Sequence, residues 1–257
     1  MSDGAWDWAG AVQAAMSAGR PIALVTLVRC EGSTPRAVGA KMLVDANGLF
    51  AGSIGGGALE EHAIGEAKAC LESGQSKLLH LALGPELGQC CGGAVDVFCE
   101  IVSGGPELYL FGAGHVAREV VAVLEGTPFR LHLVDEREEW LRSEAVSARV
   151  ARHESWEDVA RATGWSARTS YVAVMTHSHQ LDEDIVRALL DKPLRYLGLI
   201  GSATKWTRIK KRLHARGAEP AAIERVRCPI GLDIGGKSPR EVAISLAAEL
   251  ISLVNGK

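Results

Sequence analysis

The segment LYLFGAGHVAREVVAVL, residues 108–124, decides the fold of the second half of the chain. An apolar strand runs into a turn with Gly112 and Gly114, and a helix with Ala117 follows. Asp135 ends the next strand, 21 residues beyond Gly114. At this spacing the first glycine permits a tight turn, the second lets a pyrophosphate approach the backbone, and the acidic residue accepts from a ribose hydroxyl. The segment therefore predicts a βα unit with nucleotide-type geometry.

Strands and helices alternate from this segment onward. The strands ELYLFG, RLHLVD, TSYVAVMT and RYLGLIG alternate with helices expected from Gly114, Asp182 and Ala203, and a last helix is expected from Pro239 to about Leu253. Such alternation is typical of parallel βαβ units with helices on both faces of the sheet. We therefore predict a C-terminal domain, residues 107–257, with a Rossmann-like doubly wound parallel sheet in an α/β protein.

The first half has a mixed pattern. We expect a helix over 5–18, a strand over 21–29, two strands around an Asn-Gly turn within 41–54, a helix over 58–73, and strands over 77–83 and 94–102. The segment SGGPE, residues 103–107, is the expected linker. These elements predict a smaller N-terminal α+β domain over residues 1–103.

The composition is that of a globular protein. Apolar residues make up 47% of the 257 residues, charged residues 23%, and the formal net charge is -3, which argues against a nucleic-acid partner. No apolar run reaches the roughly 18 residues of a membrane span. Asp3 and Asp7 stand where a signal peptide has lysine or arginine. We therefore expect a cytoplasmic protein, without a membrane partner, whose six cysteines are thiols.

Histidines follow two of the expected strands. His177 and His179 come after TSYVAVMT, with Asp182 as the expected N-cap of the next helix, and His115 lies in the first turn of the glycine-loop helix. If the strand persists, His177 and His179 point the same way. A zinc site of three histidines is one interpretation. We favour hydrogen-bond donors to an anionic ligand, because strand ends and helix N-termini meet at this edge.

Two later segments also suit anions. GLIGSATK leads into a helix that carries Lys205, a second helix N-terminus for an anion. GLDIGGKS, residues 231–238, formally matches a phosphate-binding P-loop, but Pro229 interrupts the short segment before it. Ser238 and Glu241 also fit the capping box of an ordinary helix. We favour that interpretation over ATP hydrolysis.

Glycine-rich segments mark the first half as well. Gly52 to Gly57, including Gly55 and Gly56, precede a helix and can form an anion-binding nest of backbone N–H groups, with Arg36 and Lys41 as candidate cations. The alternative is a pair of glycine-rich turns.

LGQCCGG, residues 87–93, places Cys90 and Cys91 between glycines. A disulfide between neighbouring cysteines is strained, which leaves soft-metal contact, sulfur handling or a buried apolar pair. The glycines favour an exposed loop whose amides lower the thiol pKa.

Together, GSTPRAVGAKMLV, GSIGGGALEEH, LGQCCGG, FGAGHVA, VMTHSH, GLIGSATK and CPIGLDIGGKSPREVAISLAAEL resemble the XdhC/CoxI family of xanthine dehydrogenase accessory proteins. The resemblance runs from about Glu31 to Leu250. It implies a chaperone without turnover of its own, which binds the molybdenum cofactor (molybdopterin) as cargo and protects it during sulfuration by a cysteine desulfurase. The chaperone then aids cofactor insertion into a xanthine dehydrogenase-type apoenzyme, a molybdenum hydroxylase. A homodimer is also implied. The simple and the dinucleotide form of the cofactor both stay open, and Asp135 would meet a ribose of the dinucleotide form.

The residues proposed to bind the cofactor on this basis are Cys90, Cys91, Gly112, Gly114, His115, Asp135, His177, His179, Gly55, Gly56 and Arg36, with Cys90 and Cys91 as candidate molybdenum contacts. Ala58 stands where many relatives are expected to have cysteine, which leaves more of the sulfur chemistry to the cysteine pair. The alternative is an NAD-dependent oxidoreductase that uses Gly112, Gly114 and Asp135, although no Tyr-x-x-x-Lys pair accompanies them. Ala117 in place of the third glycine weakens the case for NAD.

Overall fold

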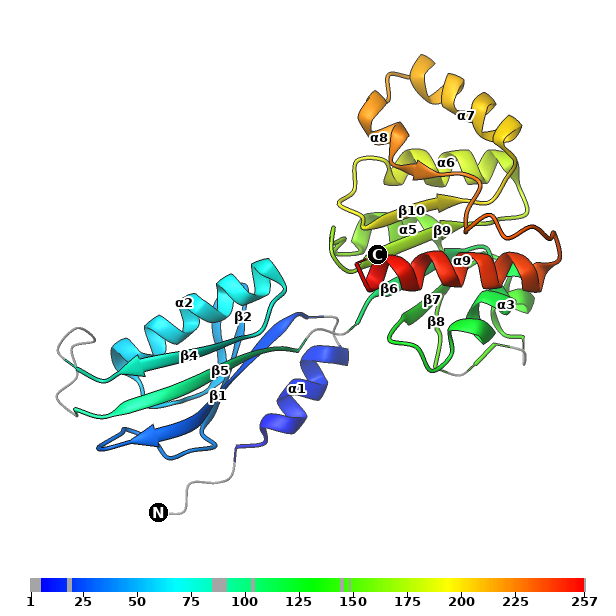
Figure 1. The fold of residues 1–257 in the computed structure, drawn as a ribbon. Helices are drawn as coiled ribbons and strands as arrows, with labels where there is room; N and C mark the ends of the chain where they lie inside the picture. The colour runs from blue at the N-terminus through cyan, green and yellow to red at the C-terminus, as the bar shows by residue number, and fades with distance from the viewer. Residues whose placement is uncertain are drawn as a thin grey trace. The chain divides into compact units, whose positions relative to one another are not determined.

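The computed structural model describes residues 6–17, 20–84, 92–102, 105–143, 146–147 and 149–256. The chain divides into two compact units, Met1–Gly104 and Gly105–Lys257 (Figure 1). In the described part of the chain, no helix has the length and apolar character required to cross a membrane.

The N-terminal unit is built on a five-stranded antiparallel sheet in the order β3-β2-β1-β5-β4. Its strands are β1 (Ile22–Glu31), β2 (Lys41–Asp45), β3 (Gly48–Gly52), β4 (Lys77–Ala82) and β5 (Ala94–Val102). The amide of Asn47 donates to Oδ1 of Asp45 at 2.8 Å in the predicted turn between β2 and β3. The strands expected in this half are confirmed, with ends displaced by one or two residues.

Each face of this sheet packs against one helix, because side chains alternate along a strand. Ala23, Val25 and Leu27 pack beneath α2 (Gly57–Ser73). Ile22 and Leu24 point to the other face, where they pack with Ala15 of α1 (Trp8–Ser17). The alternation of β1 thus places the two helices on opposite faces of the sheet.

The C-terminal unit holds a six-stranded sheet in the order β11-β10-β9-β6-β7-β8, and every pair is parallel. Its strands are β6 (Glu107–Phe111), β7 (Arg130–Val134), β8 (Ala151–His153), β9 (Ser170–Val174), β10 (Tyr196–Leu199) and β11 (Val226–Arg227). The chain moves outward from β6 through β7 to β8, then returns to β9 and moves through β10 to β11. This winding confirms the predicted doubly wound sheet.

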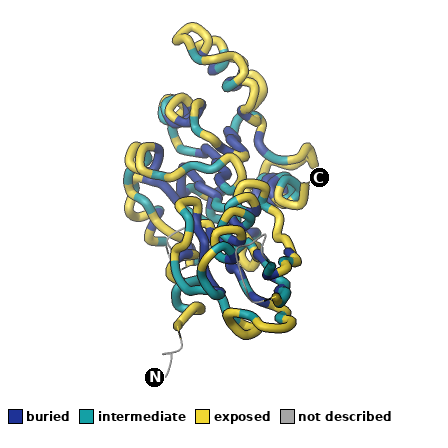
Figure 2. The backbone as a smooth tube through the Cα atoms, turned by 90° about the vertical axis from the view of Figure 1, so that its left-hand side faces the viewer, coloured by how far each residue is buried: buried dark blue, intermediate teal, exposed yellow. Residues whose placement is uncertain are grey.

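Helices cover both faces of the parallel sheet. One face packs against α3 (His115–Leu124) and α9 (Pro239–Val254). The other packs against α5 (Trp156–Ala162), α6 (His179–Leu189), α7 (Ala203–Ala215) and α8 (Pro220–Glu224). A short helix, α4 (Glu138–Leu141), follows β7. All five residues of β9 are buried, and Figure 2 marks the buried stretches of the backbone in dark blue. Burial on both faces explains the continuous apolar runs of these strands.

Serines begin several of these helices. The side chains of Ser178, Ser202 and Ser238 accept backbone N–H bonds as N-caps of α6, α7 and α9, and Ser238 forms the predicted capping box with Glu241. The prediction that Asp182 caps α6 is wrong. Because Ser178 already provides a capping oxygen, the helix begins one turn earlier and encloses Asp182, which is fully buried.

Candidate functional site

The carboxyl edge of the parallel sheet brings predicted site residues together. The neighbouring strands β6 and β9 lie where the winding direction reverses, and open α/β sheets bind ligands at such a point. A cavity of about 180 Å³ opens there, and Gly112, Asp135, Thr176 and His177 line it. Three of the residues predicted from sequence therefore share one cavity.

The two glycines of the β6–α3 turn have different roles. Gly112 has φ +109°, and a Cβ on it would lie 2.5 Å from the carbonyl oxygen of Met175. Only glycine fits where the backbones of two adjacent strands approach so closely. Gly114 has φ -68° and is the N-cap of α3, with no atom within 4 Å of a Cβ placed there. The space beside Gly114 is open for a ligand.

Both carboxylate oxygens of Asp135 accept hydrogen bonds from other groups of the protein. Its Oδ2 accepts from the amide of Ala113 at 2.7 Å and from Nη2 of Arg137 at 2.6 Å. Its Oδ1 accepts from the amide and the Nε of Arg137, at 3.0 and 2.8 Å. Burial acts to raise the pKa of Asp135, but the hydrogen bonds from Arg137 and Ala113 outweigh it and lower the pKa. The carboxylate holds the glycine loop, so a ribose hydroxyl would have to compete with Arg137.

The condition for His177 and His179 to point the same way is not met. β9 ends at Val174, and His179 is the first residue of α6, with its side chain 84% exposed. His115 is exposed and meets the ring of Trp140 edge-on, with 5.3 Å between ring centroids. No group of three His, Cys, Asp or Glu side chains among the described residues is arranged to hold a metal ion.

A basic and aromatic cluster that was not predicted from the sequence lies beside the glycine loop. The guanidinium carbons of Arg118 and Arg137 lie 4.5 and 5.0 Å from the ring centroid of Trp140, which His115 also contacts. The Nε atom of Arg118 is buried and has no hydrogen-bond partner within the described ranges. Stacking on the indole holds both cations near the first turn of α3. The signal was the placement of Arg118 in that turn, but its pairing with Trp140 depends on tertiary structure.

Lys205 belongs to a buried network rather than to a free anion site. Oδ1 of Asp182 accepts from the amide and hydroxyl of Thr176, at 3.0 and 2.7 Å. Oδ2 accepts from Nζ of Lys205 at 2.7 Å, and Lys205 also donates to the carbonyl of Ile200 at 3.0 Å. The network fixes the ends of β9 and β10 against α6 and α7. Because Asp182 already balances the charge of Lys205, this ammonium group is engaged within the protein at the start of α7.

In the N-terminal unit, the predicted nest is present and holds the protein's own carboxylate. The amides of Ile54, Gly55 and Gly56 donate to Oε1 of Glu60 at 2.9, 3.1 and 2.8 Å. The hydroxyl of Ser53 donates to the same oxygen at 2.5 Å. An anionic ligand that contacts Gly55 and Gly56 would have to displace Glu60.

These contacts predict a pH-dependent contribution from Glu60. Burial acts to raise its pKa, but the hydrogen bonds from Ser53 and the three amides lower the pKa below the ordinary 4.5. The stabilisation is therefore present above about pH 4.5 and is lost as the pH falls through the folded-state pKa. We expect Glu60→Gln to lower the free energy of unfolding by about 2 kcal/mol at pH 7. In urea denaturation, the difference from wild type should shrink towards pH 3.5.

The exposed neighbour Glu61 provides the matched control. Glu61→Gln should change the free energy of unfolding by less than about 0.5 kcal/mol at either pH. A Glu60→Gln deficit that is the same at pH 7 and pH 3.5 would show that the charge of Glu60 does not stabilise the nest.

Other predicted segments meet this nest. A Cβ on Gly55, which has φ +138°, would lie 2.5 Å from Cγ of Pro35, so the nest packs on the GSTPR loop that carries Arg36. Ser33 in the same loop forms a parallel bridge with Gly92, the residue after Cys91. The loop of Arg36, the nest and the end of LGQCCGG therefore lie together within this unit. Cys90 and Cys91 themselves lie outside the described residues.

Lys41 contacts different groups from those predicted. Its Nζ donates to the hydroxyl of Thr26 at 3.3 Å and lies 5.3 Å from the ring centroid of Trp8. The ammonium group is therefore engaged between β1 and α1.

The described cysteines are free thiols, namely Cys30, Cys70, Cys99 and Cys228. Burial raises the pKa of Cys99 to about 12 and that of Cys228 to about 11. Burial also raises the pKa of Cys70. These three thiols stay protonated at neutral pH and are weak nucleophiles and metal ligands.

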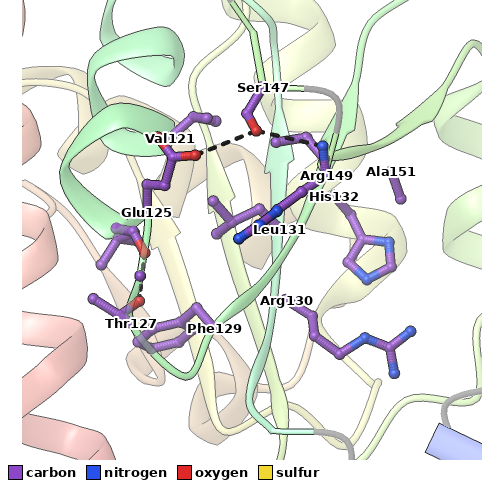
Figure 3. A pocket seen from close by; sticks show the side chains of 13 residues that line it. Val121, Glu125, Thr127, Phe129, Arg130, Leu131, His132, Ser147, Arg149 and Ala151 are labelled. Carbon is purple, nitrogen blue, oxygen red and sulfur yellow. Dashed lines mark hydrogen bonds between the residues drawn. The ribbon is translucent and has the colours of Figure 1, made fainter. Parts of the chain in front are cut away.

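Larger cavities lie elsewhere in the C-terminal unit. One of about 350 Å³ lies between the end of α3 and the amino ends of β7 and β8, where Phe129, Arg130 and Leu131 line it (Figure 3). None of the predicted site residues is in its lining, and it lies at the edge opposite to the strand carboxyl ends. Another, of about 650 Å³, lies at the carboxyl edge beside β10 and the loop before α9.

Comparison with protein families agrees with the order of motifs along the chain. Residues 108–250 match the XdhC Rossmann domain, and residues 15–82 match the XdhC and CoxI family. The chain belongs to the XdhC and CoxI family. The resemblance stated from the sequence is thereby confirmed.

Relatives in this family differ in length. The chain is 32% identical over 241 residues to the uncharacterized protein YqeB of Escherichia coli (strain K12), and the alignment covers 91% of this chain and 44% of YqeB. It is 27% identical over 156 residues to a probable xanthine dehydrogenase subunit of Bacillus subtilis (strain 168), covering 61% and 45%. It is 25% identical over 276 residues to the molybdenum cofactor insertion chaperone PaoD of Escherichia coli (strain K12), covering 95% and 86%. The chain thus spans less than half the length of the first two.

A solved structure shares the fold. The crystal structure of a xanthine dehydrogenase from Bacillus halodurans has a TM-score of 0.52 and 21% sequence identity, with 96% of each chain covered.

Proposed function

We propose that this chain is a molybdenum cofactor-binding chaperone that protects the cofactor during sulfuration and aids its insertion into a xanthine dehydrogenase-type molybdenum hydroxylase. One observation carries the proposal: similarity covers 95% of this chain and 86% of the relative named molybdenum cofactor insertion chaperone. The Bacillus subtilis relative, named as part of a xanthine dehydrogenase, supports the class of client enzyme. The working unit in this proposal is a homodimer, and a cysteine desulfurase supplies the sulfur.

The chemistry of the carboxyl edge suits an anionic cargo. The phosphate of the cofactor is proposed to lie beside Gly112 and Gly114, where the N-terminus of α3 and the guanidinium of Arg118 favour negative charge. His115 and His177 are exposed donors near the same turn. Asp135 supports the loop through Ala113, and a nucleotide-bearing cofactor would extend towards it.

The N-terminal unit has proposed anion contacts of its own. The amides of Gly55 and Gly56 are proposed to donate to an anionic group in place of Glu60, and Arg36 in the adjacent loop is proposed to supply positive charge. His179, at the start of α6, is proposed as a further donor within the C-terminal unit. Each of these contacts is to an oxygen of the cargo.

Cys90 and Cys91 are proposed to contact the molybdenum or to receive the incoming sulfur. Both tasks require a thiolate, and the raised pKa values of Cys99 and Cys228 make those two thiols poor candidates. Gly92, which follows the pair in sequence, is anchored beside the loop of Arg36. The motif therefore leads into a residue whose amide already donates to the carbonyl of Leu83 at 3.0 Å and which lies beside the loop that carries Arg36.

Metal and pterin content provide the test. The wild-type chain, purified from a molybdate-supplied host with an active cofactor pathway, should carry molybdenum and pterin. The molybdenum content of the variant Cys90→Ala/Cys91→Ala should be at least about tenfold lower than that of wild type, because soft ligands have been removed. Mass spectrometry of the metal and fluorescence of the oxidised pterin measure both.

The control is Cys70→Ala, which removes a buried thiol from the far end of α2 and should retain the cargo. A wild-type chain that binds no pterin even after reconstitution contradicts the chaperone function. A double variant with full molybdenum content contradicts the role of the cysteine pair.

A further inference from the structure

The loop between β11 and α9 contains GLDIGGKS, and neither a P-loop nor the contacts proposed above account for it. Oε2 of Glu241 accepts from the amides of Lys237 and Ser238, at 3.1 and 2.9 Å, and from the hydroxyl of Ser238 at 2.7 Å. Two of the amides that a P-loop would offer to phosphate are therefore occupied by the protein's own carboxylate. This segment is the start of a capped helix, as the sequence predicted.

Helix α9 holds the first end of this loop in place. The amide of Gly231 donates to Oε2 of Glu249 at 2.8 Å, and the hydroxyl of Tyr196 donates to the same oxygen at 2.7 Å. The hydroxyl of Ser245 donates to the carbonyl of Leu232. Gly231 has φ +85°, and a Cβ there would lie 2.2 Å from Oγ of Ser245. The backbone at this end is therefore fixed in a conformation that only glycine adopts.

The other end of the loop is held as closely. Gly236 has φ +83°, and a Cβ there would lie 2.6 Å from Cδ of Glu241. Between the two ends, Leu232 and Ile234 are 47% and 55% exposed. Apolar side chains in a fixed loop lose hydrophobic stabilisation when they stay in water. Such an arrangement indicates a surface that is preorganised for a ligand.

The exposed side chains line the cavity of about 650 Å³, together with Ile200, Ile230 and Val242. Its volume is within the range of about 300–1,000 Å³ in which proteins bind small organic molecules. The cavity adjoins the carboxyl end of β10, the edge at which open α/β sheets bind ligands. It belongs entirely to the C-terminal unit.

We propose that this cavity binds a planar, fused heteroaromatic ring, and that the pterin ring of the cargo occupies it; the second statement rests on the proposed function. Apolar walls from Ile200, Leu232 and Ile234 suit the faces of such a ring. Gly235 has no side chain, and no atom lies within 4 Å of a Cβ placed there, so its peptide groups are open to the donors and acceptors along the ring edge. A purely aliphatic ligand would leave these peptide groups unpaired, and a lone phosphate would leave the apolar walls in water.

A pterin without phosphate, dithiolene or metal tests the cavity by itself. We expect pterin-6-carboxylate to bind the full-length protein saturably when its fluorescence is titrated. Ile234→Asp places a charge in the apolar wall and should weaken binding at least about tenfold. Ile244→Asp is the matched control, because Ile244 is a 45% exposed isoleucine of α9 that is not in the cavity lining. It should change the Kd by less than twofold.

The cavity beside β10, which we call the ring site, and the chaperone function can fail independently, and the two failures give different results. A wild-type chain that does not bind pterin-6-carboxylate at millimolar concentration, or an Ile234→Asp variant that binds it like wild type, overturns the ring site. Cargo content then tests the occupant: loss of pterin in Ile234→Asp but not in Ile244→Asp supports the pterin assignment. If wild type carries no cargo yet binds pterin-6-carboxylate through Ile234, the chaperone function fails and the ring site stands.

Discussion

Replacing Gly112 with alanine is expected to lower the free energy of unfolding of the C-terminal unit by more than about 4 kcal/mol. The added Cβ would lie 2.5 Å from the carbonyl oxygen of Met175 and 2.9 Å from Cα of Thr176, at a φ of +109°. These are backbone atoms at the end of β9, which pairs with β6 in the middle of the sheet. They cannot rotate away as a side chain would, so the two strands would have to separate.

Gly114→Ala is the control for this prediction. At φ -68°, with no atom within 4 Å of the new methyl group, alanine should change the free energy of unfolding by less than about 1 kcal/mol. Urea denaturation can be followed by tryptophan fluorescence, to which the C-terminal unit contributes Trp140, Trp156, Trp165 and Trp206, four of the six tryptophans. Equal stability of the two variants would refute the close approach of β6 and β9 at Gly112. Under the proposed function, Gly114→Ala should fold but carry less cargo.

The sequence predicts the central strands of the parallel sheet well. These strands are apolar because both faces are covered, and glycines or polar turns mark their ends. β8 and β11 were not predicted. β8 has the sequence Ala151-Arg152-His153, and β11 has two residues, so neither has an apolar run long enough to recognise. Edge strands need not be apolar on both faces, which removes the signal on which the prediction depends.

The site is less predictable because each polar group has several possible partners. The sequence placed Gly55 and Gly56 in a nest and Asp135 at the end of a strand, and both placements are found. The sequence did not show that the carboxylate of Glu60 fills the nest, or that the guanidinium of Arg137 donates to the carboxylate of Asp135. A carboxylate pairs equally well with groups of a ligand and with groups of its own protein. Propensity and spacing specify the backbone, whereas the filling of a site depends on tertiary distances.

Removing the carboxylate of Asp182 is the second substitution with a large expected effect. Asp182 is fully buried, and its partner Lys205 has a side chain that is 15% exposed. In Asp182→Ala, the ammonium group of Lys205 loses its carboxylate partner and keeps the carbonyl of Ile200 as an acceptor. The amide and hydroxyl of Thr176 lose the same carboxylate. Deleting one member of a buried ion pair costs about 3–5 kcal/mol, because the remaining charge stays desolvated. Urea denaturation should show a loss of stability of that size.

A second pair on the same helix provides the comparison. Asp184 lies 3.4 Å from Arg187 at the surface, so Asp184→Ala should cost less than about 0.5 kcal/mol. The double variant Asp182→Ala/Lys205→Met removes the unpaired charge along with the acceptor, and it should be more stable than Asp182→Ala alone. A double variant as unstable as the sum of the two single changes would mean that the two groups do not interact. Thr176 also lines the cavity between β6 and β9. If the double variant is stable but carries less cargo, the lower cargo content is therefore caused by a changed geometry at this strand end and not by unfolding.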